Sequence, residues 1–150
     1  MPQSLSVVLV HLVFSTKNRE PLIHPDVQTE LYAFLGGTAR DCGCPMLDRG
    51  GTEDHIHLLC SLSRTITIAN LVEELKTRSS KWLKTKGPAY AGFHWQSGYG
   101  VFSIGRSQEA VVKKYIAGQA EHHRKFSFQD EFRLLLRKYG VEYDERYVWD

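Results

Sequence analysis

Two short stretches of this sequence carry residue types at a spacing that could do chemistry. His55 and His57 flank Ile56 inside an apolar stretch with the character of a short β-strand. Because side chains alternate between the two faces of a strand, both imidazoles point to the same side. Neutral imidazole is the commonest protein metal ligand, so the pair could form half of a metal site. A hydrogen-bonded core histidine beside an exposed one is the alternative that the pair alone leaves open.

The second stretch, 111–119, has helical character and places Tyr115 and Gln119 four residues apart on one helix face. A tyrosine, an amide oxygen and two imidazoles could surround one cation and one phosphate. Nitrogen and oxygen ligands without a thiolate favour magnesium or manganese over a structural zinc ion. The ordinary pKa of a tyrosine hydroxyl is about 10, so Tyr115 needs the metal or a nearby base to become a nucleophile.

The composition indicates one globular domain over residues 1–150. The chain is 42% hydrophobic and 24% charged, which is normal for a protein that buries a core. No apolar run approaches the roughly 20 residues of a membrane span, and the first residues lack the basic segment of a signal peptide. We therefore expect a cytoplasmic protein. The cysteines Cys42, Cys44 and Cys60 show neither zinc spacing nor the even count of a disulfide framework.

The net charge of +2 gives no argument for nucleic acid by itself, so local basic clusters must carry that argument. One cluster lies at 76–86, where the solvated face of an amphipathic helix explains it at least as well. The other surrounds Tyr115 and comprises Lys113, Lys114, His122, His123, Arg124 and Lys125. Within it, Lys113, Lys114, Arg124 and Lys125 are candidates for contact with a nucleic-acid backbone.

The apolar patterns predict an order of strands and helices. Strands are expected at 4–15, 45–49, 55–62 and 99–104, and helices at 24–43, 67–84, 107–121 and 127–140. Ser107 and Ser127 are expected to cap the last two helices. The order is the split βαβ, ferredoxin-like arrangement: an α+β fold with an antiparallel sheet, helices on one face and extra C-terminal helices.

That arrangement places the first and third strands side by side at the centre of the sheet. His11 would then lie next to the strand that carries His55 and His57. A histidine on a buried strand needs a polar partner. A core hydrogen bond explains His11 better than contact with a metal or a phosphate, which is the alternative.

The stretch 54–59 is a histidine-hydrophobe-histidine (HUH) motif, and 115–119 matches the tyrosine-to-glutamine motif that accompanies it. Together they resemble the single-tyrosine HUH transposases of the IS200/IS605 insertion sequences. Further stretches at 10–17, 95–100, 121–124 and 142–147 are similar to that family, so the resemblance covers nearly the whole chain. It implies a ferredoxin-like fold, His55, His57 and Gln119 as metal ligands, and Tyr115 as the nucleophile.

The resemblance also implies an activity and an assembly. Members cut and rejoin single-stranded DNA at hairpin-bearing element ends, with Mg²⁺ or Mn²⁺ and through a 5′-phosphotyrosine. They work as homodimers with composite sites, so Tyr115 and Gln119 would act with the histidines of the partner. The fourth strand, as a sheet edge, could pair with a second copy. The alternative is a site within one chain, in which a bend at Gly105 folds the helix back over its own sheet.

Other functions stay open at the level of the sequence. A domesticated relative could cut and join repeated chromosomal hairpins without moving its own element. A non-catalytic module could bind single strands on its sheet, although such modules use stacked aromatics where these strands carry histidine. A metal sensor would be expected to have a thiolate cluster, which the sequence lacks. Covalent attachment of single-stranded DNA separates the enzymes from the binding module.

Overall fold

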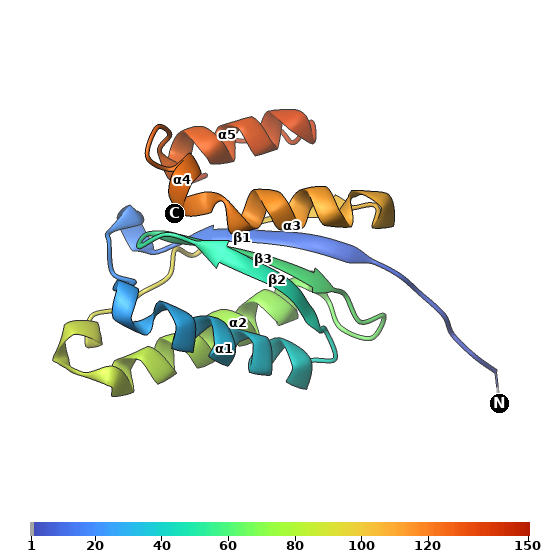
Figure 1. The fold of residues 1–150 in the computed structure, drawn as a ribbon, viewed down its shortest axis with the longest axis horizontal. Coiled ribbons are helices and arrows are strands. Elements are labelled where there is room, and N and C mark those ends of the chain that lie inside the picture. The colour runs from blue at the N-terminus through green and yellow to red at the C-terminus, as the bar shows by residue number, and fades with distance from the viewer. Residues whose placement is uncertain (1) are drawn as a thin grey trace.

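The computed structural model describes residues 2–150 and shows a four-stranded antiparallel sheet (Figure 1). The strands are β1 (Leu9–Ser15), β2 (Met46–Gly51), β3 (His55–Ser61) and β4 (Gly100–Ile104), in the sheet order β2-β3-β1-β4. The helices are α1 (Pro25–Asp41), α2 (Ile68–Leu83), α3 (Glu109–Ala117), α4 (Gln119–His122) and α5 (Phe128–Lys138). The predicted ferredoxin-like arrangement is confirmed, with β1 and β3 adjacent at the centre and β4 at an edge.

The helices form two layers around the sheet. In Figure 1, α1 and α2 lie on one face, whereas α3, α4 and α5 lie on the other. Alternation along β1 sends Leu12 and Phe14 into the core under α1 and α2, and sends Val13 into the core under α5. In β3, Ile56 joins the first of these cores. His55 and its same-face neighbours therefore point toward the C-terminal helices.

Most helix ends follow the sequence signals. The Thr67 hydroxyl accepts a hydrogen bond from the backbone N–H of Asn70 at the start of α2, and Ser127 does the same with Asp130 at the start of α5. Gly140, with a φ of 66°, follows the end of α5. The predicted Ser127 cap is confirmed. The part of the chain that the structure describes contains no helix with the length and apolarity to cross a membrane.

Three local predictions are wrong. The first strand begins at Leu9 rather than Ser4. Ser107 caps nothing, because it lies inside a 3₁₀ turn and Gln108 precedes the first residue of α3. The helix expected over 107–121 is interrupted at Gly118, where φ of −88° and ψ of 11° leave the helical range. Glycine is a poor helix former, which explains the break between α3 and α4.

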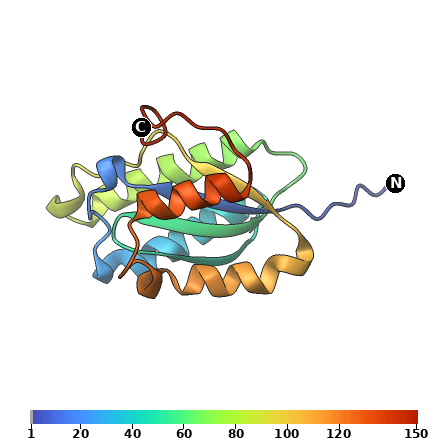
Figure 2. The same cartoon turned by 90° about the horizontal axis from the view of Figure 1, so that it is seen from above.

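Two glycines allow α3 and α5 to sit close to the sheet. A Cβ atom at Gly50 of β2 would overlap with the carbonyl oxygen of Ile116 in α3, and one at Gly100 of β4 would overlap with the ring of Phe132 in α5. The two helices thus rest on opposite borders of the sheet, and Figure 2 shows them running beside each other. The seam between them lies over the central strands, which carry the histidines.

Replacement of Gly50 by alanine is expected to lift α3 from β2 and to destabilise the fold by about 1–3 kcal/mol, the usual cost of an overpacked contact. The free energy of unfolding in urea measures the effect. Gly92→Ala is the matched control, because a Cβ atom there meets open space. Equal stability of the two variants would show that α3 moves away at no cost.

Candidate active site

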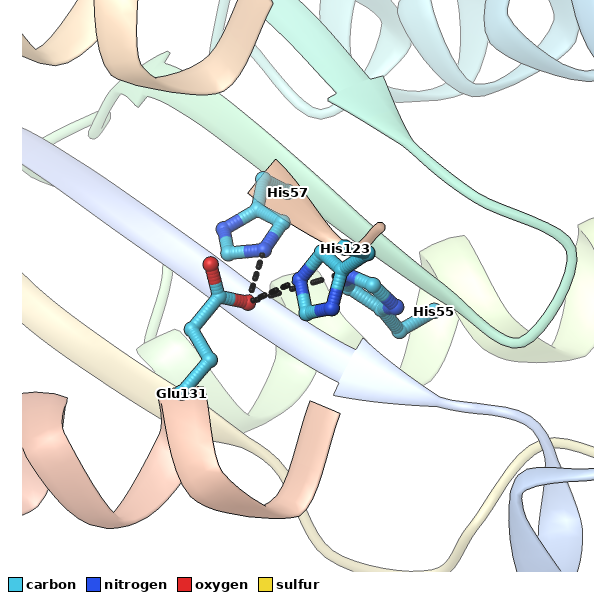
Figure 3. Close-up of side chains that lie close together, drawn as sticks. All are labelled: His55, His57, His123 and Glu131. Atoms are coloured by element: carbon cyan, nitrogen blue, oxygen red, sulfur yellow. Dashed lines mark hydrogen bonds and ion pairs between the residues drawn. The ribbon is translucent and has the colours of Figure 1, made fainter. Parts of the chain in front are cut away.

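A buried carboxylate, Glu131 of α5, lies among the histidines (Figure 3). Its Oε1 atom accepts hydrogen bonds from Nε2 of His57 and Nε2 of His123, both at 3.0 Å. Its Oε2 atom accepts from Nε2 of Gln119 at 2.9 Å and from the hydroxyl of Tyr115. The side chain is only 2% exposed. One carboxylate therefore joins the C-terminal helices to the histidine strand.

The strand histidines are held in fixed orientations. His55 and His57 are fully buried, with 0% of each residue exposed. Nδ1 of His55 lies 2.7 Å from a carboxylate oxygen of Asp54, and Nδ1 of His57 lies 2.8 Å from Nε2 of His11. Nε2 of His55 faces Oε1 of Gln119 at 3.0 Å. Partners of this kind fix the ring orientation and tautomer of histidines that ligate metals. The core hydrogen bond expected for His11 thus goes to a candidate ligand.

These residues offer a donor set for a cation. One ligand atom each from His55, His57, His123 and Glu131 lies within 4.8 Å of the others. The amide oxygen of Gln119 borders the group through its contact with His55. Imidazole nitrogens with carboxylate and amide oxygens suit a divalent ion such as magnesium or manganese. The site residues therefore fit the metal that the sequence suggested, with His123 and Glu131 as added donors.

Burial sets the charge states in the site. It lowers the pKa of His57 to about 4 and that of His11 to about 3, because a buried imidazolium lacks solvation. Burial would raise the pKa of Glu131, but hydrogen bonds from His123 and His57 outweigh it and hold that pKa well below its usual range. Burial, followed by the charge of Glu131, raises the pKa of Tyr115. A neutral tyrosine therefore donates to a charged carboxylate.

All four residues of the two motifs come together in one chain. Tyr115 and Gln119 both bond Glu131, which also bonds His57, and the rings of Tyr115 and His57 lie 5.8 Å apart. This is the geometry of the within-chain alternative. The composite arrangement across a dimer stays a prediction.

The predicted backbone-contacting residues flank this cluster. Lys113 pairs with Glu109 at 3.1 Å and Arg124 pairs with Glu121 at 3.4 Å. Both ion pairs lie near the surface, where such pairs are worth little and exchange easily. Lys114 and Lys125 are exposed. These cations stay candidates for contact with a phosphate backbone.

Sequence reasoning missed Glu131, and placed His123 in a basic cluster and in the stretch 121–124 that is similar to the family, without a role as a metal donor. The sequence did contain a signal for the role of Glu131. Glu131 shares the inner helix face with Phe128 and Leu135, which are buried. A carboxylate on an apolar stripe is almost never buried unless it is paired. That conflict predicts a polar partner under α5.

The fold and the site together define a class of protein: a small ferredoxin-like domain with a histidine pair on a central strand and a tyrosine beside it. The family model described as "Transposase IS200 like" matches residues 4–119. The chain therefore belongs to the IS200-like transposase family.

Known relatives agree with this assignment. The ISDra2 transposase TnpA of Deinococcus radiodurans is 25% identical over 114 residues, which cover 73% of this chain and 81% of that protein. A crystal structure from Deinococcus radiodurans R1, described as that of a transposase, shares 23% identity at a TM-score of 0.62 and covers 77% of this chain and 95% of that one. A REP-associated tyrosine transposase bound to a REP hairpin shares 13% identity at a TM-score of 0.55, with 77% and 70% covered. The two structures support the fold.

The low pKa values of His11 and His57 predict acid sensitivity. Both are neutral in the folded chain, but in the unfolded chain they take up protons below about pH 6.5. Their contribution to stability is therefore complete above pH 6.5 and is lost as the pH falls toward about 4. His11→Gln should flatten this decline in urea unfolding measured at several pH values. His94→Gln, at an exposed histidine, should leave the slope as in the wild type.

Glu131→Gln is expected to weaken binding of Mn²⁺ by about 10- to 100-fold, because the site loses its one buried carboxylate. Titration calorimetry of the full chain with Mn²⁺ alone measures the affinity. Glu142→Gln, at an exposed position, is the control that should bind as the wild type does. Unchanged affinity in Glu131→Gln would remove Glu131 from the donor set and leave His55, His57, His123 and Gln119.

Proposed function

We propose that this protein cuts and rejoins single-stranded DNA, with Tyr115 as the nucleophile. The observation that carries the proposal is the hydrogen bond from the Tyr115 hydroxyl to Glu131, inside the histidine cluster. That bond holds the hydroxyl oxygen of Tyr115 beside the histidine cluster, where a phosphate could contact several imidazoles. Membership of the transposase family supplies the type of reaction.

The tyrosine step balances without a further reactant. As the Tyr115 oxygen bonds to phosphorus, its proton passes to Oε2 of Glu131, and the bond from phosphorus to the 3′ oxygen breaks. The 3′ oxygen takes up a proton and leaves as a hydroxyl, while the 5′ phosphate stays on Tyr115. The new phosphodiester keeps the energy of the old one, so rejoining needs no ATP. Glu131 is thus proposed to orient the hydroxyl and to accept its proton once bonding to phosphorus has made that proton acidic, since the low pKa of this carboxylate leaves it too weak to deprotonate the free tyrosine.

His55, His57 and Gln119, with His123 and Glu131, are the residues that would hold a divalent ion. A bound Mg²⁺ or Mn²⁺ supplies Lewis acidity, which stabilises negative charge on a non-bridging phosphate oxygen. Asp54 and His11 keep the two strand imidazoles turned toward the cluster. The chain's own contribution is therefore a rigid, buried set of donors beside the nucleophile.

The proposed substrate is a single strand with a hairpin. One structural neighbour is bound to a hairpin, and the fold of this chain is similar to it. Lys113, Lys114, Arg124 and Lys125 lie around the site and suit the backbone of such a strand. Chemistry on DNA also fits the cytoplasmic location expected from the sequence.

Tyr115→Phe should abolish the covalent adduct between protein and a hairpin-bearing single strand, while strand binding survives. The variant loses only one oxygen, so the fold should persist. Denaturing gels with labelled strands and magnesium measure the adduct, and excess chelator should remove it from the wild type. Tyr99→Phe, at a partly exposed tyrosine, is the control that should keep it. An undiminished adduct in Tyr115→Phe would assign the nucleophile to another tyrosine.

We further propose that Tyr115 acts with the histidines of its own chain, also within a homodimer paired along the edge of β4. The support is that Tyr115 and His57 bond the same carboxylate of one chain. This differs from the composite site that the resemblance implies. Co-expressed Tyr115→Phe and His57→Ala chains distinguish the two. Every within-chain site in the mixture carries a lesion, so we expect no cleavage; restored cleavage in confirmed mixed dimers would establish the composite site.

A further inference from the structure

A cavity of about 270 Å³ opens beside the proposed nucleophile, between α3 and α5. Tyr115 and Glu131 belong to its lining. Its walls are largely apolar and include Val111 of α3, Leu134 of α5 and Tyr139, the residue that follows α5. The cavity therefore gives access from solvent to the seam over the central strands, at the hydroxyl that is proposed to react.

Two of the apolar groups that line this cavity, Val111 and Leu134, are not part of a core, whereas Leu135 belongs to one and Tyr139 packs against it. Val111 is 63% exposed and Leu134 is 51% exposed, although the remaining inner face of α5 is well buried. Neither residue belongs to a core cluster of the described chain. The fold thus leaves apolar side chains in water on both sides of one opening, a feature that marks binding sites when it is contiguous.

Two polar groups in the lining, His122 and Lys138, restrict how an occupant could lie in the cavity. Nε2 of His122 is buried and has no hydrogen-bond partner among residues 2–150, and it lies 3.4 Å from Oε2 of Glu131. Lys138 also lines the cavity and supplies a positive charge. An occupant should therefore have a flat or apolar body, a polar edge for His122 and a negative group for Lys138.

We propose that this cavity holds the nucleobase next to the scissile phosphate, in an unstacked conformation. The inference rests on the proposed function, because a phosphate attacked by Tyr115 would lie beside the cavity that Tyr115 lines. Enzymes that act on nucleotides commonly hold an extruded base between apolar and aromatic side chains and contact its edge by hydrogen bonds. Here Leu134, Val111 and Tyr139 supply the walls, His122 meets the edge of the base, and Lys138 meets a backbone phosphate.

A second cavity, of about 430 Å³, is a poorer candidate for a base in this position. It lies beyond His123 and is lined by Glu53, Asp54 and Arg124 rather than by the tyrosine. A base next to the phosphate that Tyr115 attacks must lie close to Tyr115, which does not line this second cavity. We therefore place the base next to the scissile phosphate in the cavity between α3 and α5.

The test uses a hairpin strand recovered as a covalent adduct from a random library. In this strand, 2-aminopurine replaces one base at a time on either side of the scissile phosphate. Tyr115→Phe protein binds the strand without cutting it. Stacking on Tyr139 should quench the probe several-fold at one of the two flanking positions, and an abasic site at that position should slow adduct formation by the wild type about tenfold.

Leu134→Trp fills the mouth of the cavity and should remove the quench and slow adduct formation about tenfold. Val111→Trp, at a second position in the lining, should do the same. With two independent variants, a folding defect in one of them cannot be mistaken for the loss of the pocket. Ile68→Trp is the matched control, since Ile68 is 36% exposed and begins α2 on the other face of the sheet. Ile68→Trp should leave both the quench in the Tyr115→Phe protein and the rate of adduct formation by the wild type unchanged.

The outcomes separate this inference from the proposed function. Absence of any adduct overturns the proposed function and the base pocket with it. An adduct with no quench at either flanking position, or a quench that survives both tryptophan variants, overturns the base pocket alone. A change from dimer to monomer in Leu134→Trp, with the quench intact, would make this face an interface between copies and would also overturn it.

Discussion

The buried carboxylate of Glu131 is the interaction on which the arrangement of the C-terminal half depends. A carboxylate in an apolar interior is costly unless hydrogen bonds and opposite charge compensate its lost hydration. Glu131 obtains these bonds from two histidines, a glutamine and a tyrosine. The observed orientation of α5 brings the carboxylate within reach of all four partners, so the need for partners helps to fix how this helix docks on the sheet.

The same constraint organises the site around the seam between α3 and α5. Close contacts at Gly50 and Gly100 support the two helices over the outer strands, and the polar groups collect over the inner ones. Tyr115 and Gln119 reach the seam from one side and Glu131 from the other. Because these groups already point at one another, little rearrangement would be needed to receive a cation and a phosphate, which is the condition for electrostatic preorganisation.

The match to the family model ends at Gln119, whereas His123 and Glu131 follow it in the chain. The histidine strand and the tyrosine helix therefore belong to the shared part of the family. The carboxylate that joins them in this protein comes from α5, outside the matched residues. Glu131, the proposed base and metal donor, thus comes from a helix that follows the matched residues and also lines the cavity beside Tyr115.

The sequence determined what depends on local spacing. Alternation in a strand puts His55 and His57 on one face, a four-residue step puts Tyr115 and Gln119 on one face, and the element order predicts the ferredoxin-like sheet with His11 beside them. These features follow from backbone geometry, which the chain fixes residue by residue. The start of the first strand and the division of the 107–121 helix into two escaped prediction, although Gly118 is a weak point for a helix, because propensities define element ends poorly. Only the tertiary structure decided that Glu131 lies between the two motifs, that His123 joins it, and that the tyrosine faces histidines of its own chain. Those contacts join residues up to 74 positions apart, and they depend on how a helix docks across a sheet, which no local pattern encodes.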